Sequence, residues 1–336
     1  MFPPLLALAL ILLFNVVIQP GFLSVEIRDG RLFGGLVTVL NRSVPVMLLA
    51  TGMTLVIATG GTDLSVGSVL AIASAVSISL IRGDDASPTA DTAMALGLVV
   101  VITMIVGIIC GLWNGFLVAK IGMPPVIATL ILMVAGRGLT QNITRERSIT
   151  TGHLPFGEIA NGFTLGIPNQ IWIALIVFLV FWYLTRRTAF GLFIESVGAN
   201  RPAANLAGVR ATSILIIIYA LSGLCASIAG ILNASNVRVI EPMNTGQNME
   251  LDAILAVVLG GTNMRGGKFN LGGSCVGAII LMALTQTMYF YGVPVEFSLS
   301  IKAIVIVAVV LIQSPTTRKF LASHIKLSKK REVSAK

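Results

Sequence analysis

Residues 93–118 read AMALGLVVVITMIVGIICGLWNGFLV, a run without one charged side chain. A helix needs about 20 predominantly apolar residues to cross the hydrocarbon core of a bilayer, so this run predicts a membrane-spanning helix. Gly107, Gly111 and Gly115 recur at every fourth position within it. Such spacing lets two helices approach closely in lipid. The stretch therefore indicates helices packed against helices inside a membrane.

The composition extends this prediction to the whole chain. Of the 336 residues, 55% are hydrophobic and 11% are charged, and the mean hydropathy is +0.92. A soluble domain carries about 25% charged residues, so this inventory cannot cover a water-facing surface. The three cysteines lie in apolar runs without disulfide or metal-site spacing, and the two histidines are far apart in the sequence. We therefore expect no metal site.

We predict an all-α, polytopic membrane helix bundle of about ten transmembrane helices. The predicted spans are 3–20, 35–58, 64–81, 93–118, 124–142, 169–185, 212–233, 252–262, 272–291 and 295–313. The eighth span is too short to cross alone, so we expect either a half-span or a helix that continues into its polar flanks. The whole chain, 1–336, is expected to form a single transmembrane domain with a basic tail over 318–336.

The basic residues predict the orientation of this bundle. The net charge is +9, but in a membrane protein the position of each Lys and Arg matters more than the sum. With both termini in the cytoplasm, fourteen of these residues fall inside, six outside and three within spans. An inside excess of this kind favours both termini being cytoplasmic.

Between the second and third spans lies the motif Gly60-Gly61-Thr62-Asp63-Leu64-Ser65-Val66-Gly67. Its two adjacent glycines break the helix, and Thr62 or Asp63 can cap the next helix with a side-chain oxygen. A tight capped turn is the plainer interpretation. An ion-coordinating Asp63 is the alternative, although the loop offers no second acidic residue to support it.

Residues 195–211 form a polar stretch rich in Ala and Gly between two hydrophobic spans. A chain reversal needs only a handful of residues, so a longer helical stretch predicts a surface on which another protein docks. Asn200 can cap a short helix that has Pro202 in its first turn. The alanines at 203, 204 and 207 would then form a small, smooth face. An interfacial helix without a docking role is the alternative.

Residues 259–273 form a glycine-rich segment that superficially resembles a nucleotide-binding loop. The pattern GxxxxGK[ST] fails, because Gly267 follows Gly266 and Phe269 follows Lys268. No such signature occurs elsewhere in the chain. We therefore predict that the chain does not hydrolyse ATP itself.

These three segments resemble the permease subunits of bacterial ATP-binding cassette importers for monosaccharides, of the ribose, galactose, arabinose and galactofuranose type. Branched-chain amino-acid permeases are more distant kin. The resemblance covers nearly the whole chain and rests on 60–67, on 197–209 and on 250–267. Segments 29–34 and 130–138 look closest to the galactofuranose type. Thr62 departs from the family pattern, in which many members carry an aliphatic residue there.

The resemblance implies a transport permease of the bacterial inner membrane and not an enzyme. It implies that the chain pairs with a second copy or a sister permease, docks a cytoplasmic ATPase that holds the ATP and Mg, and receives sugar from a periplasmic binding protein. No cofactor in the chain itself and no nucleic acid are implied. Residues 198–208 would be the coupling helix that enters the ATPase. Its implied residues are Gly198, Ala199, Asn200, Ala203, Ala204, Ala207 and Gly208.

A neutral sugar requires a path lined by amides and hydroxyls. The candidates by depth in the spans are Asn114, Arg137, Gln141, Asn142, Asn233 and Gln286. Hydrogen bonding between helices is the alternative for each amide. We expect Arg137 to reach an acid at the outer face, such as Glu146, with substrate contact as its alternative.

Two other classes of protein fit the sequence less well. An ion-coupled secondary transporter would need buried acidic residues, and Asp63, Asp252 and Glu296, all near span ends, are the only candidates. A membrane enzyme would need a cluster of His, Asp, Glu or Ser, which the sequence does not show. Within the resemblance, a branched-chain amino acid stays the alternative cargo to a sugar.

Overall fold

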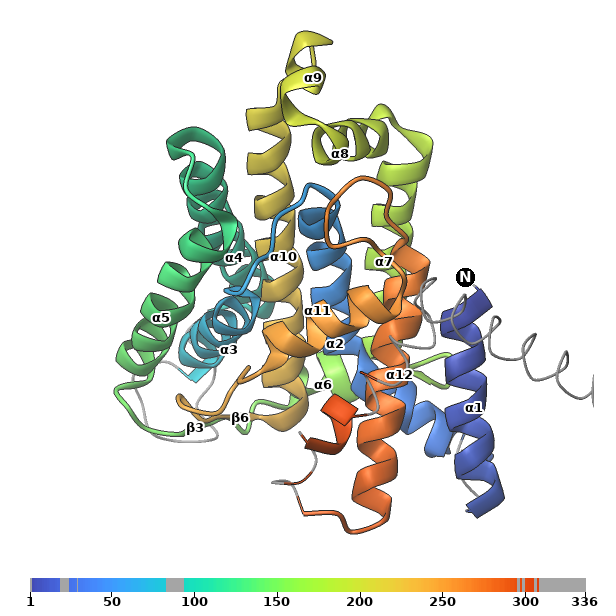
Figure 1. Cartoon of the computed structure of the whole chain (residues 1–336). Helices are drawn as coiled ribbons and strands as arrows, with labels where there is room; N and C mark the ends of the chain where they lie inside the picture. Colours follow the sequence, from blue (N-terminus) through green and yellow to red (C-terminus); the bar gives the residue numbers. More distant parts are fainter. Residues whose placement is uncertain are drawn as a thin grey trace, which may run out of the picture.

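The computed structural model describes residues 2–18, 24–28, 30–82, 94–294, 297, 300–304 and 307. Helices dominate it, and they pack side by side into one bundle (Figure 1). The helices are α1 Phe2–Ile18, α2 Gly35–Ala58, α3 Val66–Arg82, α4 Leu96–Phe116, α5 Pro125–Thr144, α6 Leu154–Asn161, α7 Asn169–Arg187, α8 Ala189–Ala199, α9 Arg201–Leu206, α10 Ala211–Val237, α11 Met249–Leu259 and α12 Leu271–Phe290. A π-helix, η1 Leu117–Ile121, continues α4.

Six of these helices are long and apolar enough to cross a membrane, namely α2, α4 with η1, α5, α7, α10 and α12. They confirm the predicted all-helical membrane architecture. Each predicted span from the first to the ninth lies on a helix. The tenth, 295–313, falls mostly outside the described residues, and the tail over 318–336 falls wholly outside them. The count of ten therefore stays a prediction.

Two of the predicted spans are shorter helices. At 1.5 Å per residue, the 17 residues of α3 extend about 26 Å and the 11 residues of α11 about 17 Å, less than the ~30 Å of a hydrocarbon core. α11 begins at Met249, three residues into the polar flank of the eighth predicted span, and is still too short to cross a bilayer alone. It ends before 260–262 because the chain turns there, with Gly261 at a φ of 83°.

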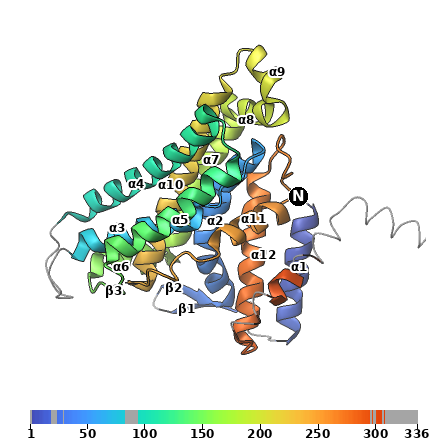
Figure 2. The ribbon, with the colours of Figure 1, turned by 60° about the vertical axis from the view of Figure 1, so that its left-hand side comes forward.

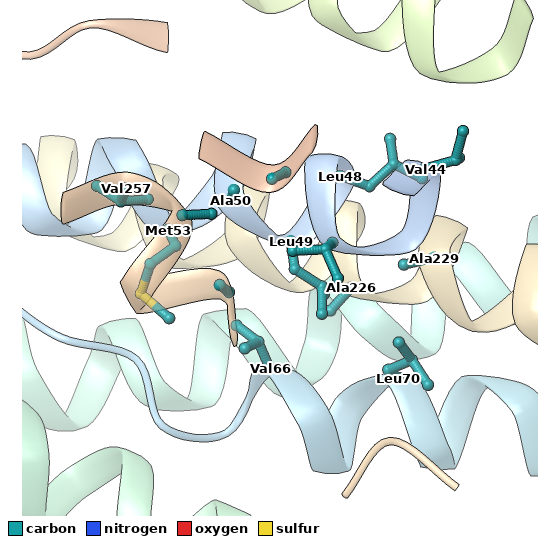
Figure 3. Packing of buried hydrophobic residues seen from close by; sticks show 14 of the residues in the cluster. Val44, Leu48, Leu49, Ala50, Met53, Val66, Leu70, Ala226, Ala229 and Val257 are labelled. Carbon is teal, nitrogen blue, oxygen red and sulfur yellow. The ribbon is translucent and has the colours of Figure 1, made fainter. Parts of the chain in front are cut away.

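Small residues let α10 pack against its neighbours, as the glycine spacing in α4 predicts. A Cβ added to Gly107 would lie 2.5 Å from the carbonyl oxygen of Gly223, and one on Gly115 would lie 2.8 Å from the Cα of Ile216. The core continues on the other side of α10. Figure 3 shows Leu49 of α2 and Leu70 of α3 meeting Ala226 in this core. Close van der Waals packing of this kind holds helices together in lipid.

The two ends of the bundle differ (Figures 1 and 2). One end, which we call the α9 end, carries α8, α9, the loop 260–270 and the joint between α4 and α5. The other, the hairpin end, carries α6 and the short strand pairs. Sequence analysis did not predict these antiparallel pairs, which are β1 Val25–Arg28 with β2 Arg31–Gly34, β3 Ile149–Thr150 with β6 Val239–Ile240, and β4 Phe163–Thr164 with β5 Ile167–Pro168. The N–H of Leu32 donates to the carbonyl of Gly166 at 2.8 Å and links two of the pairs.

Candidate functional site

A buried polar network joins the loop after α2 to α4 and α10. Asp63 Oδ1 accepts hydrogen bonds from the backbone N–H of Ser65 (3.0 Å) and from its Oγ (2.6 Å). Ser222 Oγ donates to Asp63 Oδ2 at 3.0 Å, and Asn114 Nδ2 donates to Ser65 Oγ at 2.8 Å. All four side chains are at most 2% exposed. A buried carboxylate needs such donors. The network therefore holds the turn before α3 in place and ties it to α4 and α10.

The glycines of the same motif lie where other backbone segments approach closely. Gly60 has a φ of 77°, in the left-handed region that favours glycine. A Cβ on Gly61 would lie 2.9 Å from Tyr219 Oη. A Cβ on Gly67 would lie 2.6 Å from the carbonyl oxygen of Gly246 and would also meet the carboxylate of Glu250. The start of α3 therefore touches the chain that leads into α11.

Arg137 reaches this same junction and not Glu146, which corrects the expectation from sequence. Its Nη1 donates to the carbonyl of Thr245 at 2.5 Å, and its Nη2 donates to the carbonyl of Gly246 at 3.0 Å. The carboxylate of Glu250 interacts with it electrostatically. The backbone carbonyls before the short helix α11 already accept the hydrogen bonds of the Arg137 guanidinium, so it needs no acid at the outer face.

Segment 241–247 lines two cavities at the hairpin end. One, of about 500 Å³, is lined by Gln141 and Glu241 among others. The second, of about 350 Å³, is lined by Asn233, Gln247 and again Glu241. Sequence analysis missed the acceptors and donors of this segment, although its polar run Glu-Pro-Met-Asn-Thr-Gly-Gln-Asn between two apolar spans was a usable signal. The two cavities combine carboxylate, amide and apolar groups.

The remaining path candidates do not share these cavities. Asn114 belongs to the network around Asp63. Asn142 is exposed on α5, and Gln286 is buried on α12. The structure thus brings Gln141 and Asn233 to cavities that share Glu241, places Arg137 at the adjoining junction, and leaves the other three candidates elsewhere.

At the α9 end, the stretch 195–211 forms two helices and not one. α8 ends at Ala199 and α9 covers only Arg201–Leu206. Asn200 Oδ1 accepts the N–H of Ala203 at 3.0 Å, which confirms the predicted cap. The cap residue itself is extended, so the helix breaks there, and the implied coupling helix of 198–208 is correspondingly shorter.

The predicted smooth alanine face of this segment is also divided. Ala204 is 5% exposed and points into the bundle, whereas Ala203, Ala207 and Gly208 are exposed. Leu206, which sequence analysis passed over, is 91% exposed. Gly198 packs inward, since a Cβ there would lie 2.7 Å from the backbone nitrogen of Gly267. The exposed part of α9 is therefore a small apolar tip centred on Leu206.

The glycine-rich loop after α11 packs onto the ends of other helices. The N–H of Gly267 donates to the carbonyl of Ala58 at 2.8 Å. Arg186 Nη2 donates to the carbonyl of Phe269 at 3.1 Å, and its guanidinium lies 5.6 Å from the centre of the Phe269 ring. These contacts anchor the loop to α2 and α7 beneath α8.

Comparison with known proteins places the chain among transport permeases. The sequence model of the family described as "Branched-chain amino acid transport system / permease component" matches residues 35–310. The galactofuranose transporter permease protein YtfT of Escherichia coli K12 is 46% identical over 312 residues, which is 93% of this chain and 89% of that protein. The fructose import permease protein FruF of Bifidobacterium longum is 39% identical over 98% of this chain and 91% of its own length. The ribose import permease protein RbsC of Escherichia coli K12 is 36% identical over 92% of each chain. No solved structure matches.

Proposed function

We propose that this chain, which belongs to the family of permease components of branched-chain amino acid transport systems, is the membrane subunit of an importer for a monosaccharide. It is a multi-pass protein of the inner membrane and a transport component, not an enzyme. The identity of 46% to a galactofuranose permease over 93% of the chain carries the proposal of a sugar cargo. Fructose and ribose permeases at lower identity support the same class of substrate.

The proposed topology has ten spans with both termini in the cytoplasm and the α9 end facing inward. The distribution of basic residues supports it. Helices, loops and joints of the α9 end hold Lys120, Arg186, Arg187, Arg201, Arg210, Arg265 and Lys268. Lys and Arg concentrate on the cytoplasmic side of membrane proteins, so the α9 end is the side on which a cytoplasmic partner docks.

The proposed energy source for transport is a separate ATPase that binds to α9. The exposed tip of α9 supports this docking, because Leu206 and its exposed neighbours Ala207 and Gly208 leave an apolar surface there that a partner would bury. ATP and Mg would be held by that partner and not by this chain. Closure of the ATPase would tilt the helices of the permease between two arrangements. This mechanism is alternating access. A second copy or a sister permease completes the path.

The proposed sugar path enters at the hairpin end, where a periplasmic binding protein would deliver the cargo. Gln141, Asn233, Glu241 and Gln247 line the two cavities there. Amide and carboxylate groups hydrogen-bond to hydroxyls, and apolar atoms between them suit the C–H faces of a sugar ring.

Uptake into vesicles tests the proposal. The chain is reconstituted with the ATPase and the binding protein proposed as its partners, and labelled galactofuranose, fructose, ribose, arabinose and leucine are offered one at a time. ATP-dependent uptake of one sugar is expected. Uptake of leucine alone would make the chain an amino-acid permease. Uptake without the ATPase, driven by a proton or sodium gradient, would make it an ion-coupled transporter.

A further inference from the structure

The end of α4 leaves α-helical geometry directly before the joint with α5. In the π-helix Leu117–Ile121, the N–H groups of Gly122 and Met123 both donate to the carbonyl of Leu117, the latter at 3.1 Å. Pro124 and Pro125 follow, and proline has no backbone N–H. Short π-helical turns often occur at functional sites, so the joint is a candidate for movement.

This pattern leaves the carbonyl of Ala119 without a donor from the following turn. Its α-helical partner would be the N–H of Met123, which Leu117 takes, and its π-helical partner would be Pro124, which has none. Arg201 fills the gap, because its Nη2 donates to the Ala119 oxygen at 3.2 Å. Arg201 is the first residue of α9. One side chain therefore connects α9 directly to the end of α4.

The surroundings of this contact leave room for the joint to move. A cavity of about 300 Å³ lies between Arg201, the joint at Gly122 and Pro124, and the loop at Gly60. Gly122 has a φ of 85°, and a Cβ there would meet nothing within 4 Å. The helix beyond the joint, α5, carries Arg137, which holds the junction with α11. α4 itself is held against α10 by its close-packed glycines, and α5 packs against α3, where a Cβ on Gly136 would lie 3.0 Å from the Cβ of Ser68, so the joint is where these two packed pairs of helices meet.

We propose that Arg201 is a positioning residue that transmits displacement of α9 to α5 through the carbonyl of Ala119 and the joint at Gly122. This inference rests on the proposed function, in which an ATPase displaces α9. The guanidinium is always charged, so its hydrogen bond to the carbonyl is of the stronger kind. A push on α9 then moves the last turn of α4, and Gly122 converts that movement into a change of direction of α5.

The test compares Arg201→Met with Arg201→Lys in the full chain, assembled with its ATPase and binding protein in vesicles. The readout is ATP hydrolysed per molecule of galactofuranose, fructose or ribose imported, whichever the wild-type complex takes up. We expect Arg201→Met to raise this ratio about tenfold, the equilibrium factor of a hydrogen bond from a charged donor. Arg201→Lys keeps a hydrogen-bond donor, so its ratio is expected to lie between those of the wild type and Arg201→Met. Arg265→Met, at an exposed arginine in the loop 260–270, is the matched control and is expected to keep the wild-type ratio.

A wild-type ratio in Arg201→Met would overturn the inference. Loss of ATPase co-purification in Arg201→Met would overturn it too, because Arg201 would then be a docking residue. Gly122→Ala is a second variant. Its Cβ meets no atom within 4 Å, but the φ of 85° disfavours alanine, so the melting temperature is measured alongside. Slower import with retained ATPase binding is expected, and an unchanged import rate contradicts the role of the joint. Absence of ATP-dependent sugar uptake by the wild-type complex would instead refute the proposed function, before any variant is compared.

Discussion

Replacing Leu206 with alanine is expected to weaken binding of the ATPase subunit while leaving the permease itself folded. Leu206 ends α9 and is 91% exposed, so truncation removes almost no contact within the chain. Burying a leucine side chain fully is worth about 1.5–3 kcal/mol. At about 2 kcal/mol, the dissociation constant rises roughly 30-fold. Leu206→Glu is expected to raise the dissociation constant further, because docking would then bury an unpaired charge.

The assay titrates the purified ATPase onto the permease in lipid nanodiscs, with the thermal stability of each variant measured in parallel. Leu165→Ala is the matched control, since Leu165 is 86% exposed but lies at the hairpin end, and it is expected to bind the ATPase normally. Ala204→Glu is the contrasting variant, because Ala204 is 5% exposed and the change is expected to destabilise the permease itself. Unchanged ATPase affinity in both Leu206 variants would refute docking through this tip.

Three further changes test the packing that positions the site. Asp63→Asn replaces an acceptor oxygen facing Ser222 with an NH₂ group. The free energy of unfolding is expected to fall by about 1–3 kcal/mol, which lowers the melting temperature in detergent. Gly67→Ala forces a Cβ against the chain before α11 and is expected to lower the yield of folded protein. Gly138→Ala, on a helix with nothing within 4 Å, should leave that yield unchanged. Arg137→Gln breaks two hydrogen bonds to backbone carbonyls, so amide hydrogen exchange over residues 244–248 is expected to rise, and unchanged exchange would contradict its anchoring role.

Several site features could be predicted from short stretches of sequence. The cap at Asn200 is one, because its carboxamide bonds an N–H only three residues away. The close packing of Gly107 and Gly115 is another, because their spacing repeats along one face of a single helix. By contrast, the inward turn of Ala204 and the exposure of Leu206 depend on how α9 rotates over α10 and the loop beneath it. The sequence alone placed Ala204 on the docking face and gave no reason to single out Leu206.

The sequence by itself determined that the chain forms membrane helices, where most of them begin and end, and which family it belongs to. These properties depend on the length, apolarity and local order of neighbouring residues, since a long uncharged run has few other stable structures. Only the tertiary structure decided which polar groups meet. Asp63 and Ser222 are 159 positions apart, and Arg137 and Arg201 both bind backbone carbonyls, which every residue possesses. Such pairs are set by the rotation and register of whole helices against one another, and no local pattern records that geometry.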